Sequence, residues 1–199
     1  MTTQEHTPRL NHQFAEPDYP YVLLVDRDGK VVGTEEKIKA HREGNLHRAF
    51  SVFIFNEKGE MLLQQRAFSK YHFGGLWSNS CCSHQKLNET SLQAAHRRLE
   101  EELGFDTELR EVFSFIYRAE DRETRLIEHE LDTVLVGFYD ESFIFNSEEV
   151  QDVKWITIAE LFLWLNREPA AFSYWFKTAL LELKNKGLLS KKTILELFQ

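Results

Sequence analysis

The segment from Thr90 to Gly104 constrains the fold more than any other part of the chain, because it carries a full set of helix signals. Thr90 and Gln93 have the spacing of a capping box, in which two side chains satisfy main-chain N–H groups at a helix start. Gly104 supplies the break at the other end. Between them, apolar side chains recur on one helical stripe formed by Leu92, Ala95, Leu99 and Leu103. We therefore expect one helix here, packed by that stripe against a core.

Apolar runs interrupted by turn residues predict strands on both sides of this helix. Residues 21–26 and 31–33 flank a turn at 27–30, so they are expected to form a hairpin. Residues 50–54 are apolar on both faces, which is typical of a central strand, and a turn at 56–60 leads into a partner at 61–64. Further strands are expected at 113–118, 131–139 and 149–158, and a structured loop at 68–83.

The last third of the chain is expected to be helical. Thr157 and Glu160 form a second capping-box pattern for a helix that runs to Leu165. Further helices are expected over 170–186 and 190–198. Mixed strands around a central helix, followed by trailing helices, predict a layered α+β domain. We expect residues 1–20 to be a flexible leader and residues 21–199 to form a single domain.

The charge balance excludes several classes of partner. Thirty-two acidic against 24 basic residues give a net charge of −8, which argues against a general binder of nucleic acid or of anionic membranes. The sequence contains no apolar run of about 18 residues, so no membrane span is expected. Cys81 and Cys82 are adjacent, so they cannot staple the fold as a disulfide framework. We expect a cytoplasmic protein that holds any anionic ligand with a local basic cluster or a metal ion.

Glu128 and Glu130 are the first candidates for a metal site. Residues two apart on a strand point to the same face, and two carboxylates that share a face favour a shared proton or a cation. Imidazoles combined with carboxylates suit zinc, manganese and similar divalent ions. His41, His47 and His84 lie on other predicted elements, and chain spacing alone does not bring them together. Taken singly, each of these histidines and glutamates is more often a solvated or structurally satisfied side chain than a metal ligand.

The charged face of the 90–104 helix resembles the Nudix signature, a loop and helix that bind a metal diphosphate. The matching positions are Ser83, Glu89, Arg97, Arg98, Leu99, Glu101, Glu102, Gly104 and Phe105. Ser83 replaces the leading glycine of the signature, and Arg98 replaces the glutamate that follows the arginine. A guanidinium at that position removes a metal ligand and adds a phosphate-binding group, which favours holding a diphosphate over cutting it. The simpler alternative is a solvated helix face with i,i+4 ion pairs.

Five further segments resemble the type I isopentenyl-diphosphate isomerase family, the Nudix-fold, non-flavin branch. They are Asn79-Ser80-Cys81-Cys82-Ser83-His84, Leu46-His47-Arg48-Ala49-Phe50-Ser51, Tyr117-Arg118-Ala119, Glu128-His129-Glu130 and Phe172-Ser173-Tyr174-Trp175. The resemblance covers the chain from Tyr21 to the helix that follows Trp175. It implies a Nudix-like mixed sheet layered between helices, in a single domain with a helical C-terminal third.

The resemblance also implies the ligand sites. A divalent ion, Zn²⁺, Mn²⁺ or Mg²⁺, would be held by His41, His47, His84, Glu128 and Glu130. A Mg²⁺ that arrives with the substrate diphosphate would be held by Glu102 and the main-chain carbonyl of Cys82. The diphosphate itself would contact Lys37, Arg66, Lys70 and Arg98.

The reaction implied by the resemblance is a 1,3-allylic proton shift from isopentenyl diphosphate to dimethylallyl diphosphate. Cys82 would transfer a proton on one side of the carbon skeleton, and Glu130 with Tyr117 on the other. Trp175 would stabilise the intermediate carbocation with its ring. Cys82 and Trp175 are alternatively ordinary core side chains. A Nudix hydrolase and a catalytically silent, metal-stabilised binding protein are the rival functions. No partner beyond the small-molecule substrate is expected, and the oligomeric state is left open.

Overall fold

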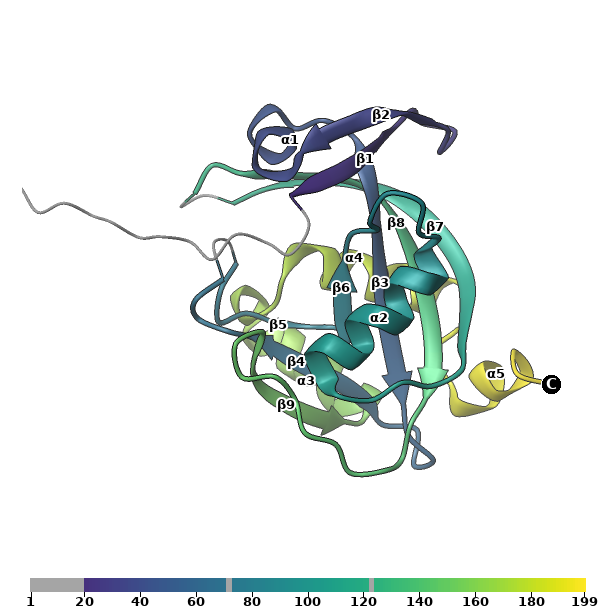
Figure 1. Cartoon of the computed structure of the whole chain (residues 1–199). Coiled ribbons are helices and arrows are strands. Elements are labelled where there is room, and N and C mark those ends of the chain that lie inside the picture. Colours follow the sequence, from purple (N-terminus) through teal and green to yellow (C-terminus); the bar gives the residue numbers. More distant parts are fainter. Residues whose placement is uncertain (1–19, 71–72, 122–123) are drawn as a thin grey trace, which may run out of the picture.

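The computed structural model describes residues 20–70, 73–121 and 124–199 (Figure 1). The strands are β1 (Tyr21–Val25), β2 (Val31–Glu36), β3 (His47–Phe55), β4 (Met61–Arg66), β5 (Trp77–Ser78), β6 (Cys81–Ser83), β7 (Leu109–Glu120), β8 (Ile127–Phe138) and β9 (Val150–Ile156). The helices are α1 (Lys37–Glu43), α2 (Ser91–Leu103), α3 (Ile158–Arg167), the 3₁₀ turn η1 (Pro169–Ala171), α4 (Tyr174–Asn185) and α5 (Lys191–Glu196). Among these residues, no helix combines the length and the apolar character needed to cross a membrane.

β3 is the strand on which the described mixed sheet is organised. It pairs with β1, β4 and β6 in antiparallel fashion and with β8 in parallel along its whole length. β8 in turn pairs with β7 in a long antiparallel ribbon, and β9 pairs with β4. A strand buried on both faces is typically apolar at nearly every position. In β3, residues 50–55 are all buried, and all except Ser51 are apolar.

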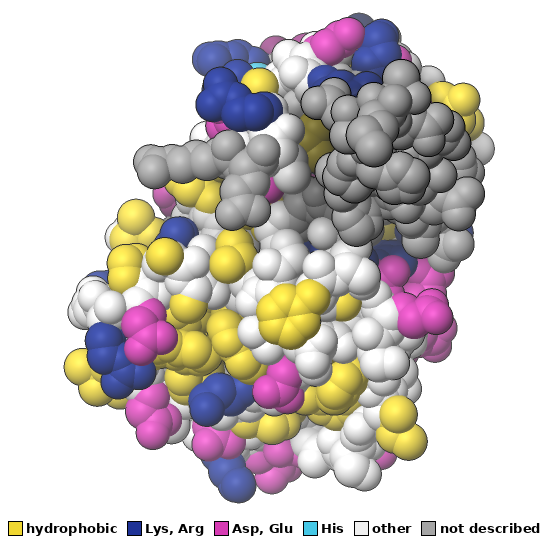
Figure 2. All heavy atoms as spheres, turned by 90° about the vertical axis from the view of Figure 1, so that its left-hand side faces the viewer, with side chains coloured by type: hydrophobic (Ala, Val, Ile, Leu, Met, Phe, Trp, Pro, Cys, Tyr) yellow, Lys and Arg dark blue, Asp and Glu magenta, His cyan; other side chains and the backbone are white. Residues whose placement is uncertain are grey.

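Two apolar clusters cover the two faces of the sheet. One contains Phe50, Val52 and Ile54 of β3 together with the apolar stripe of α2. The other contains Phe53 and Phe55 of β3 together with buried residues of α4, α3 and α5. In Figure 1, α2 accordingly lies in front of the sheet and α4 behind it. On the face drawn in Figure 2, acidic and basic side chains are interspersed with apolar ones.

The structure confirms most of the expected elements. The hairpins β1–β2 and β3–β4 are present, as are the capping boxes of α2 at Thr90 and of α3 at Thr157. β7 and β8 are longer than the runs at 113–118 and 131–139. The α+β class and the layered sheet are therefore as expected. The leader assigned to residues 1–20 lies outside the described residues, except for its last one.

Two expectations were wrong in detail. The segment 68–83 is not loop throughout, because it contains β5 and β6, which pair with β4 and β3. A continuous helix over 170–186 is also wrong, because Phe172 forms a parallel bridge with Trp77 and the Ser173 N–H donates to the Trp77 carbonyl at 2.9 Å. This pairing holds residues 172–173 extended and makes α4 begin at Tyr174.

Candidate metal centre and active site

Strand register places the candidate catalytic residues on one face of the sheet. His47 of β3 lies opposite Glu130 of β8, and Glu130 lies opposite Tyr117 of β7. Ser51, four residues further along β3, lies opposite Cys82 of β6. Paired residues project to the same face, and so do residues an even number apart on a strand. Cys82, Glu130 and Tyr117 therefore share the face that α4 covers, while Cys81 projects towards α2.

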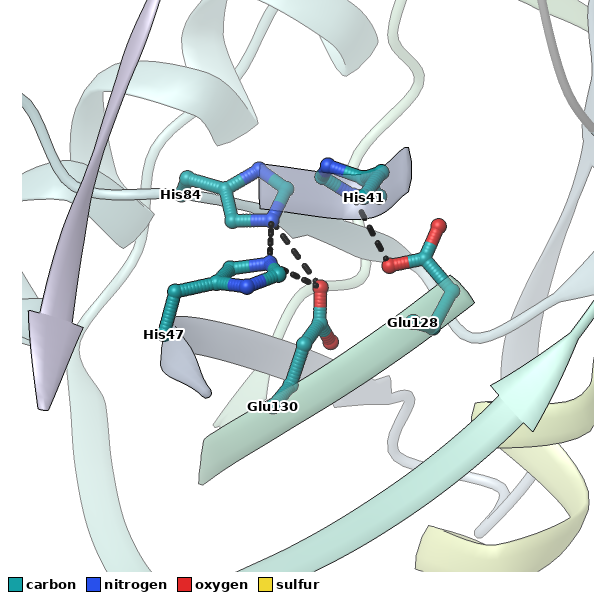
Figure 3. Close-up of side chains that lie close together, drawn as sticks. All are labelled: His41, His47, His84, Glu128 and Glu130. Carbon is teal, nitrogen blue, oxygen red and sulfur yellow. Dashed lines mark hydrogen bonds and ion pairs between the residues drawn. The ribbon is translucent and has the colours of Figure 1, made fainter. Parts of the chain in front are cut away.

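Five side chains converge at the ends of these strands. His41 comes from α1, His47 from β3, Glu128 and Glu130 from β8, and His84 from just after β6. One nitrogen or oxygen atom from each lies within 4.8 Å of the others (Figure 3). All five are buried or nearly so. The sequence paired the two glutamates correctly on one face, and the fold brings the three histidines to them.

Hydrogen bonds orient the imidazoles towards the centre of the cluster. The Nδ1 atoms of His41 and His47 lie 2.6 Å and 2.8 Å from the carbonyls of Lys37 and Asn45, so each carries the proton and donates it. Their Nε2 lone pairs then face inwards, where His41 Nε2 lies 3.1 Å from Glu128 Oε2. His84 Nε2 lies 3.2 Å from His47 Nε2 and 2.9 Å from Glu130 Oε1.

The carboxylates give this cluster a negative potential that suits a cation, since Glu128 holds the pKa of His41 above its usual value against the effect of burial. Burial, together with the Lys37 charge, lowers the pKa of His84 to about 3, so its imidazole is neutral. Burial and the Glu128 charge oppose ionisation of Glu130, yet the adjacent imidazoles of His47 and His84 hold its pKa below the usual value. His47 carries its proton on Nδ1, so its contact with His84 Nε2 at 3.2 Å requires a proton or a cation between the two nitrogens. Neutral imidazoles and ionised carboxylates are the donor set of zinc and manganese sites.

The proton-transfer candidates flank this cluster. Tyr117 donates its hydroxyl proton to Glu130 Oε2 at 2.5 Å, and burial with the neighbouring carboxylates holds the pKa of Tyr117 well above its usual value. Burial and the nearby carboxylates of Glu102 and Glu130 raise the pKa of Cys82 to about 12, although the positive charge of Arg66 lowers it in part. The Cys82 side chain is therefore a thiol at neutral pH and carries a proton.

Trp175 lies at the start of α4 and packs into the same apolar cluster as Cys82. Its indole Nε1 donates to Ser78 Oγ at 2.9 Å, and the Arg66 Cζ atom lies 5.2 Å from the ring centroid. Phe73 meets the ring edge-on, with a centroid separation of 5.3 Å. The ring is thus held on several sides and is almost fully buried.

The four candidate diphosphate contacts come from three elements and a loop, and the other three influence the pKa of Lys37. Lys37 begins α1, Arg66 ends β4, Lys70 follows β4 and Arg98 lies on α2. Burial lowers the pKa of Lys37 to about 8; Glu128 opposes this, whereas Lys70, Arg98 and Arg66 lower it further. The cations therefore form the local basic cluster that an acidic chain needs for an anionic ligand.

Carboxylates balance this basic cluster. Arg98 donates to Glu101 at 2.9 Å, to Glu149 at 2.9 Å, and to Glu102 through Nε at 3.0 Å. Lys70 also pairs with Glu149. Arg97, by contrast, bonds Glu89 at 2.8 Å and so ties the start of the Nudix-like segment to the helix. Glu149 therefore joins Arg98 to Lys70, whereas Arg97 bonds Glu89 and Glu101.

Sequence reasoning missed two residues of this region. Glu149 was noted only as the beginning of a strand, yet it joins Lys70 to Arg98. Ser78 was not singled out, and it bonds the indole of Trp175. The sequence indicated Glu149 only through its position at the start of a predicted strand. The role of Ser78 depends on Trp175, a residue 97 positions away, and no local pattern indicates it.

Comparisons with known proteins agree with this geometry. The NUDIX domain model matches residues 45–176. Isopentenyl-diphosphate Delta-isomerase 2 of Photorhabdus laumondii subsp. laumondii is 47% identical over 156 residues, which cover 78% of this chain and 88% of that protein. The isopentenyl-diphosphate Delta-isomerase of Serratia proteamaculans is 47% identical over 162 residues, which cover 81% and 90% of the two chains.

Solved structures show the same fold. A crystal structure of a Deinococcus radiodurans protein has a TM-score of 0.62 at 24% identity, covering 77% of this chain and 91% of that one. The MutT protein of Methanosarcina mazei Go1 has a TM-score of 0.58 at 16% identity, covering 71% and 95%. With a matching domain model and relatives aligned over most of their length, the chain belongs to the NUDIX-fold isopentenyl-diphosphate Delta-isomerase family.

Proposed function

We propose that this chain converts isopentenyl diphosphate into dimethylallyl diphosphate by adding a proton at one end of the allylic unit and removing one at the other. The observation that carries the proposal is the placement of two proton-bearing groups on one face of the sheet, on opposite sides of β3. One is the Cys82 thiol of β6, and the other is the pair formed by Tyr117 and Glu130. An antarafacial shift needs such groups on two opposing walls.

The rest of the pocket suits a short-lived tertiary carbocation. An alkene is a very weak base, and water would capture the cation that protonation creates, so the pocket must be dry. Trp175, Phe73 and Tyr117 line this region with apolar surface. The interaction of a cation with the indole face contributes roughly 2 kcal/mol when both are desolvated. Oxidation and hydrolysis play no part in the step.

Two divalent ions are proposed alongside these residues. His41, His47, His84, Glu128 and Glu130 would hold one, for which Zn²⁺, Mn²⁺ and Mg²⁺ are the candidates. Bound there, it would fix the orientation of the Glu130 carboxylate and increase its acidity. Glu102 and the Cys82 carbonyl would hold a Mg²⁺ that enters with the diphosphate. Lys37, Arg66, Lys70 and Arg98 would bind the diphosphate oxygens.

The protein is proposed to act in the cytoplasm on this small molecule alone. Both cysteines are free thiols, as expected in a reducing compartment. The net charge of −8 gives no support to a nucleic-acid or membrane partner.

One incubation separates the proposal from its rivals. The protein is mixed with Mg²⁺ and isopentenyl diphosphate in heavy water, and the products are followed by NMR. Deuterium in a dimethylallyl product supports the isomerase. Released phosphate would instead identify a hydrolase, and an unchanged substrate a binding protein. The pairing of Arg98 with Glu101 and Glu149 argues against the hydrolase, because it neutralises carboxylates that a metal-activated water would need.

A further inference from the structure

Ser78 and Asn79 form a buried chain of hydrogen bonds between Trp175 and the strand that carries Cys82. The indole Nε1 donates to Ser78 Oγ at 2.9 Å, and Ser78 Oγ donates to Asn79 Oδ1 at 2.9 Å. Asn79 Nδ2 then donates to the Cys81 carbonyl at 2.7 Å and to the Val52 carbonyl at 3.2 Å. Ser78, Asn79 and Ser173 are all fully buried.

The chain satisfies every donor and acceptor of the Ser78 hydroxyl. A serine hydroxyl has one proton and two lone pairs. The proton goes to Asn79, and the two lone pairs accept from the Trp175 indole and from Ser173, whose Oγ lies 3.0 Å away. No other orientation of this hydroxyl keeps all three bonds, so the direction of the indole N–H is fixed. A satisfied buried network of this kind specifies a single arrangement of its members.

Both ends of the chain belong to groups with a proposed role in the reaction. At one end, the Cys81 carbonyl is part of the peptide that joins Cys81 to Cys82, so the bond from Asn79 fixes that peptide plane. At the other end, the indole N–H of Trp175 donates to Ser78. This hydrogen bond increases the electron density of the indole ring and so strengthens its attraction for a cation. The two sides of the pocket are thereby fixed relative to each other.

We infer that Ser78 is a positioning residue that holds the Trp175 ring against the developing carbocation through the indole hydrogen bond, with Asn79 linking it to the Cys82 strand. This inference rests on the proposed function. The carbocation exists only around the transition state, so an interaction with it changes kcat and leaves substrate binding unaffected. Loss of the Ser78 hydroxyl is therefore expected to lower kcat and to leave KM close to its original value.

The kinetic test is a double-mutant cycle with a matched control. Ser78→Ala is expected to lower kcat about tenfold with KM changed less than about twofold. In the Trp175→Phe background, which has no indole N–H, Ser78→Ala is expected to change kcat less than about twofold. Ser80→Ala is the control, because the Ser80 hydroxyl is equally buried but bonds the main chain of Leu62 and Ile54. It should lower Tm and leave kcat unchanged within about twofold.

A spectroscopic test needs no substrate. With ¹⁵N-labelled tryptophan, the indole N–H signal of Trp175 is the one that disappears in Trp175→Phe. It should move upfield and exchange faster with water in Ser78→Ala, and stay in place in Ser80→Ala. Ser78→Cys, which keeps the packing volume but offers a weaker acceptor, gives a second variant and is expected to lose an intermediate part of kcat.

The outcomes separate this inference from the proposed function. A wild-type protein that makes no dimethylallyl diphosphate overturns the proposed function and the kinetic role, while the indole signal still reports the hydrogen bond. With an active wild type, an unchanged kcat in Ser78→Ala, Ser78→Cys or Trp175→Phe overturns the inference. An equal loss from Ser78→Ala in both backgrounds overturns it too, because Ser78 would then act without the indole.

Discussion

Cys81 and Cys82 are neighbours in the chain with opposite surroundings. Cys82 lies on the same face of the sheet as Glu130, whereas Cys81 is fully buried towards α2, and burial together with Glu102 raises the pKa of Cys81 well above the usual value. We predict that Cys82→Ala lowers kcat by about 10² to 10⁴, the usual worth of a positioned acid or base. Cys81→Ala should cost about 1 kcal/mol of unfolding free energy and leave kcat near normal. Steady-state kinetics and urea unfolding measure the two effects.

An inactive Cys81→Ala protein with an active Cys82→Ala protein would contradict the register of β6. It would also remove His84 from the metal cluster, because His84 follows Cys82 by two residues on the same segment.

His84 is the member of the metal cluster best suited to test the site as a whole. Its imidazole bridges His47 and Glu130 and comes from a different segment than either. We predict that the purified wild-type protein retains about one divalent ion per chain after dialysis and that His84→Ala loses it together with most of its activity. His96→Ala is the control, since His96 pairs with Asp106 at the surface. Metal analysis by mass spectrometry decides: full occupancy in His84→Ala removes His84 from the site.

At the scale of elements, α2 depends on its cap. The Thr90 hydroxyl accepts from the Gln93 N–H at 3.2 Å, and the Gln93 side chain accepts from the Thr90 N–H at 2.9 Å. Thr90→Ala is predicted to lower the free energy of unfolding by about 1 kcal/mol. KM should stay the same within about twofold, because Arg98 and Glu102 lie two turns or more further along the helix. Urea unfolding followed by circular dichroism measures the first effect, and a large rise in KM would contradict the second.

The same helix carries Arg98, which is proposed to bind the substrate diphosphate. Arg98→Glu would leave Glu101, Glu102, Glu149 and the new carboxylate close together with one cation fewer. We predict at least a tenfold rise in KM from the lost phosphate contact, with a lower Tm from repulsion. Arg97→Gln is the control on the neighbouring residue, which should lower Tm and leave KM unchanged within about twofold. An unchanged KM in Arg98→Glu would show that Arg98 does not contact substrate.

Local chemistry explains which elements the sequence predicts. Capping boxes and hairpin turns depend on residues a few positions apart, so α2, α3 and the two hairpins could be located from the sequence. β6 has three residues and exists because Phe50 to Val52 lie beside it, which no local pattern reveals. The break at 172–173 likewise depends on Trp77, about 95 positions earlier, as reflected in the bond between Ser78 and Ser173.

The residues of the candidate site also differ in whether local sequence or distant partners determine their positions. The shared face of Glu128 and Glu130 follows from their spacing on one strand. The addition of His41, His47 and His84 required either the fold or the family resemblance, because they come from three different segments. Ser78 could not be assigned, since its partner Trp175 becomes a neighbour only through the pairing of residue 172 with β5. The position of Glu149 at the start of a strand could be predicted, but its partner Lys70 comes close only through the pairing of β9 with β4.

At the scale of the whole molecule, four cations of an acidic chain act on one another although they come from separate parts of the fold. Lys37 lies on α1, Arg66 on β4, Lys70 in the loop after β4 and Arg98 on α2, and repulsion from the other three adds to the effect of burial in lowering the pKa of Lys37 to about 8. We predict that kcat/KM declines above about pH 8, as Lys37 loses its charge in the free protein. Bound diphosphate favours the charged lysine, so the decline in kcat should occur at higher pH. Lys37→Arg should move the decline in kcat/KM upwards by at least one pH unit.

The same shift has a consequence for stability with a definite sign. Between about pH 8 and the ordinary lysine pKa of 10.5, the unfolded chain binds the Lys37 proton more strongly than the folded one does. The contribution of Lys37 to the free energy of unfolding therefore rises with pH across that window. Urea unfolding of wild type and Lys37→Met at several pH values isolates this contribution. If the free energy of unfolding changed equally with pH in the two proteins, the lowered pKa of Lys37 would be contradicted.

β3 is hydrogen-bonded to β6 on one side and to β8 on the other. Cys82 and Glu130 therefore stand on the two strands that flank a single shared strand, held there by main-chain bonds that do not involve pocket side chains. If Cys82 and Glu130 transfer the protons as proposed, the stereochemical course of the reaction is a property of the sheet. Changing the aromatic residues near Trp175 would then alter which carbon skeletons fit, but each skeleton that fits would still meet Cys82 from one side and Glu130 from the other. Variants with an altered substrate range should accordingly keep the handedness of deuterium incorporation that the wild-type protein shows.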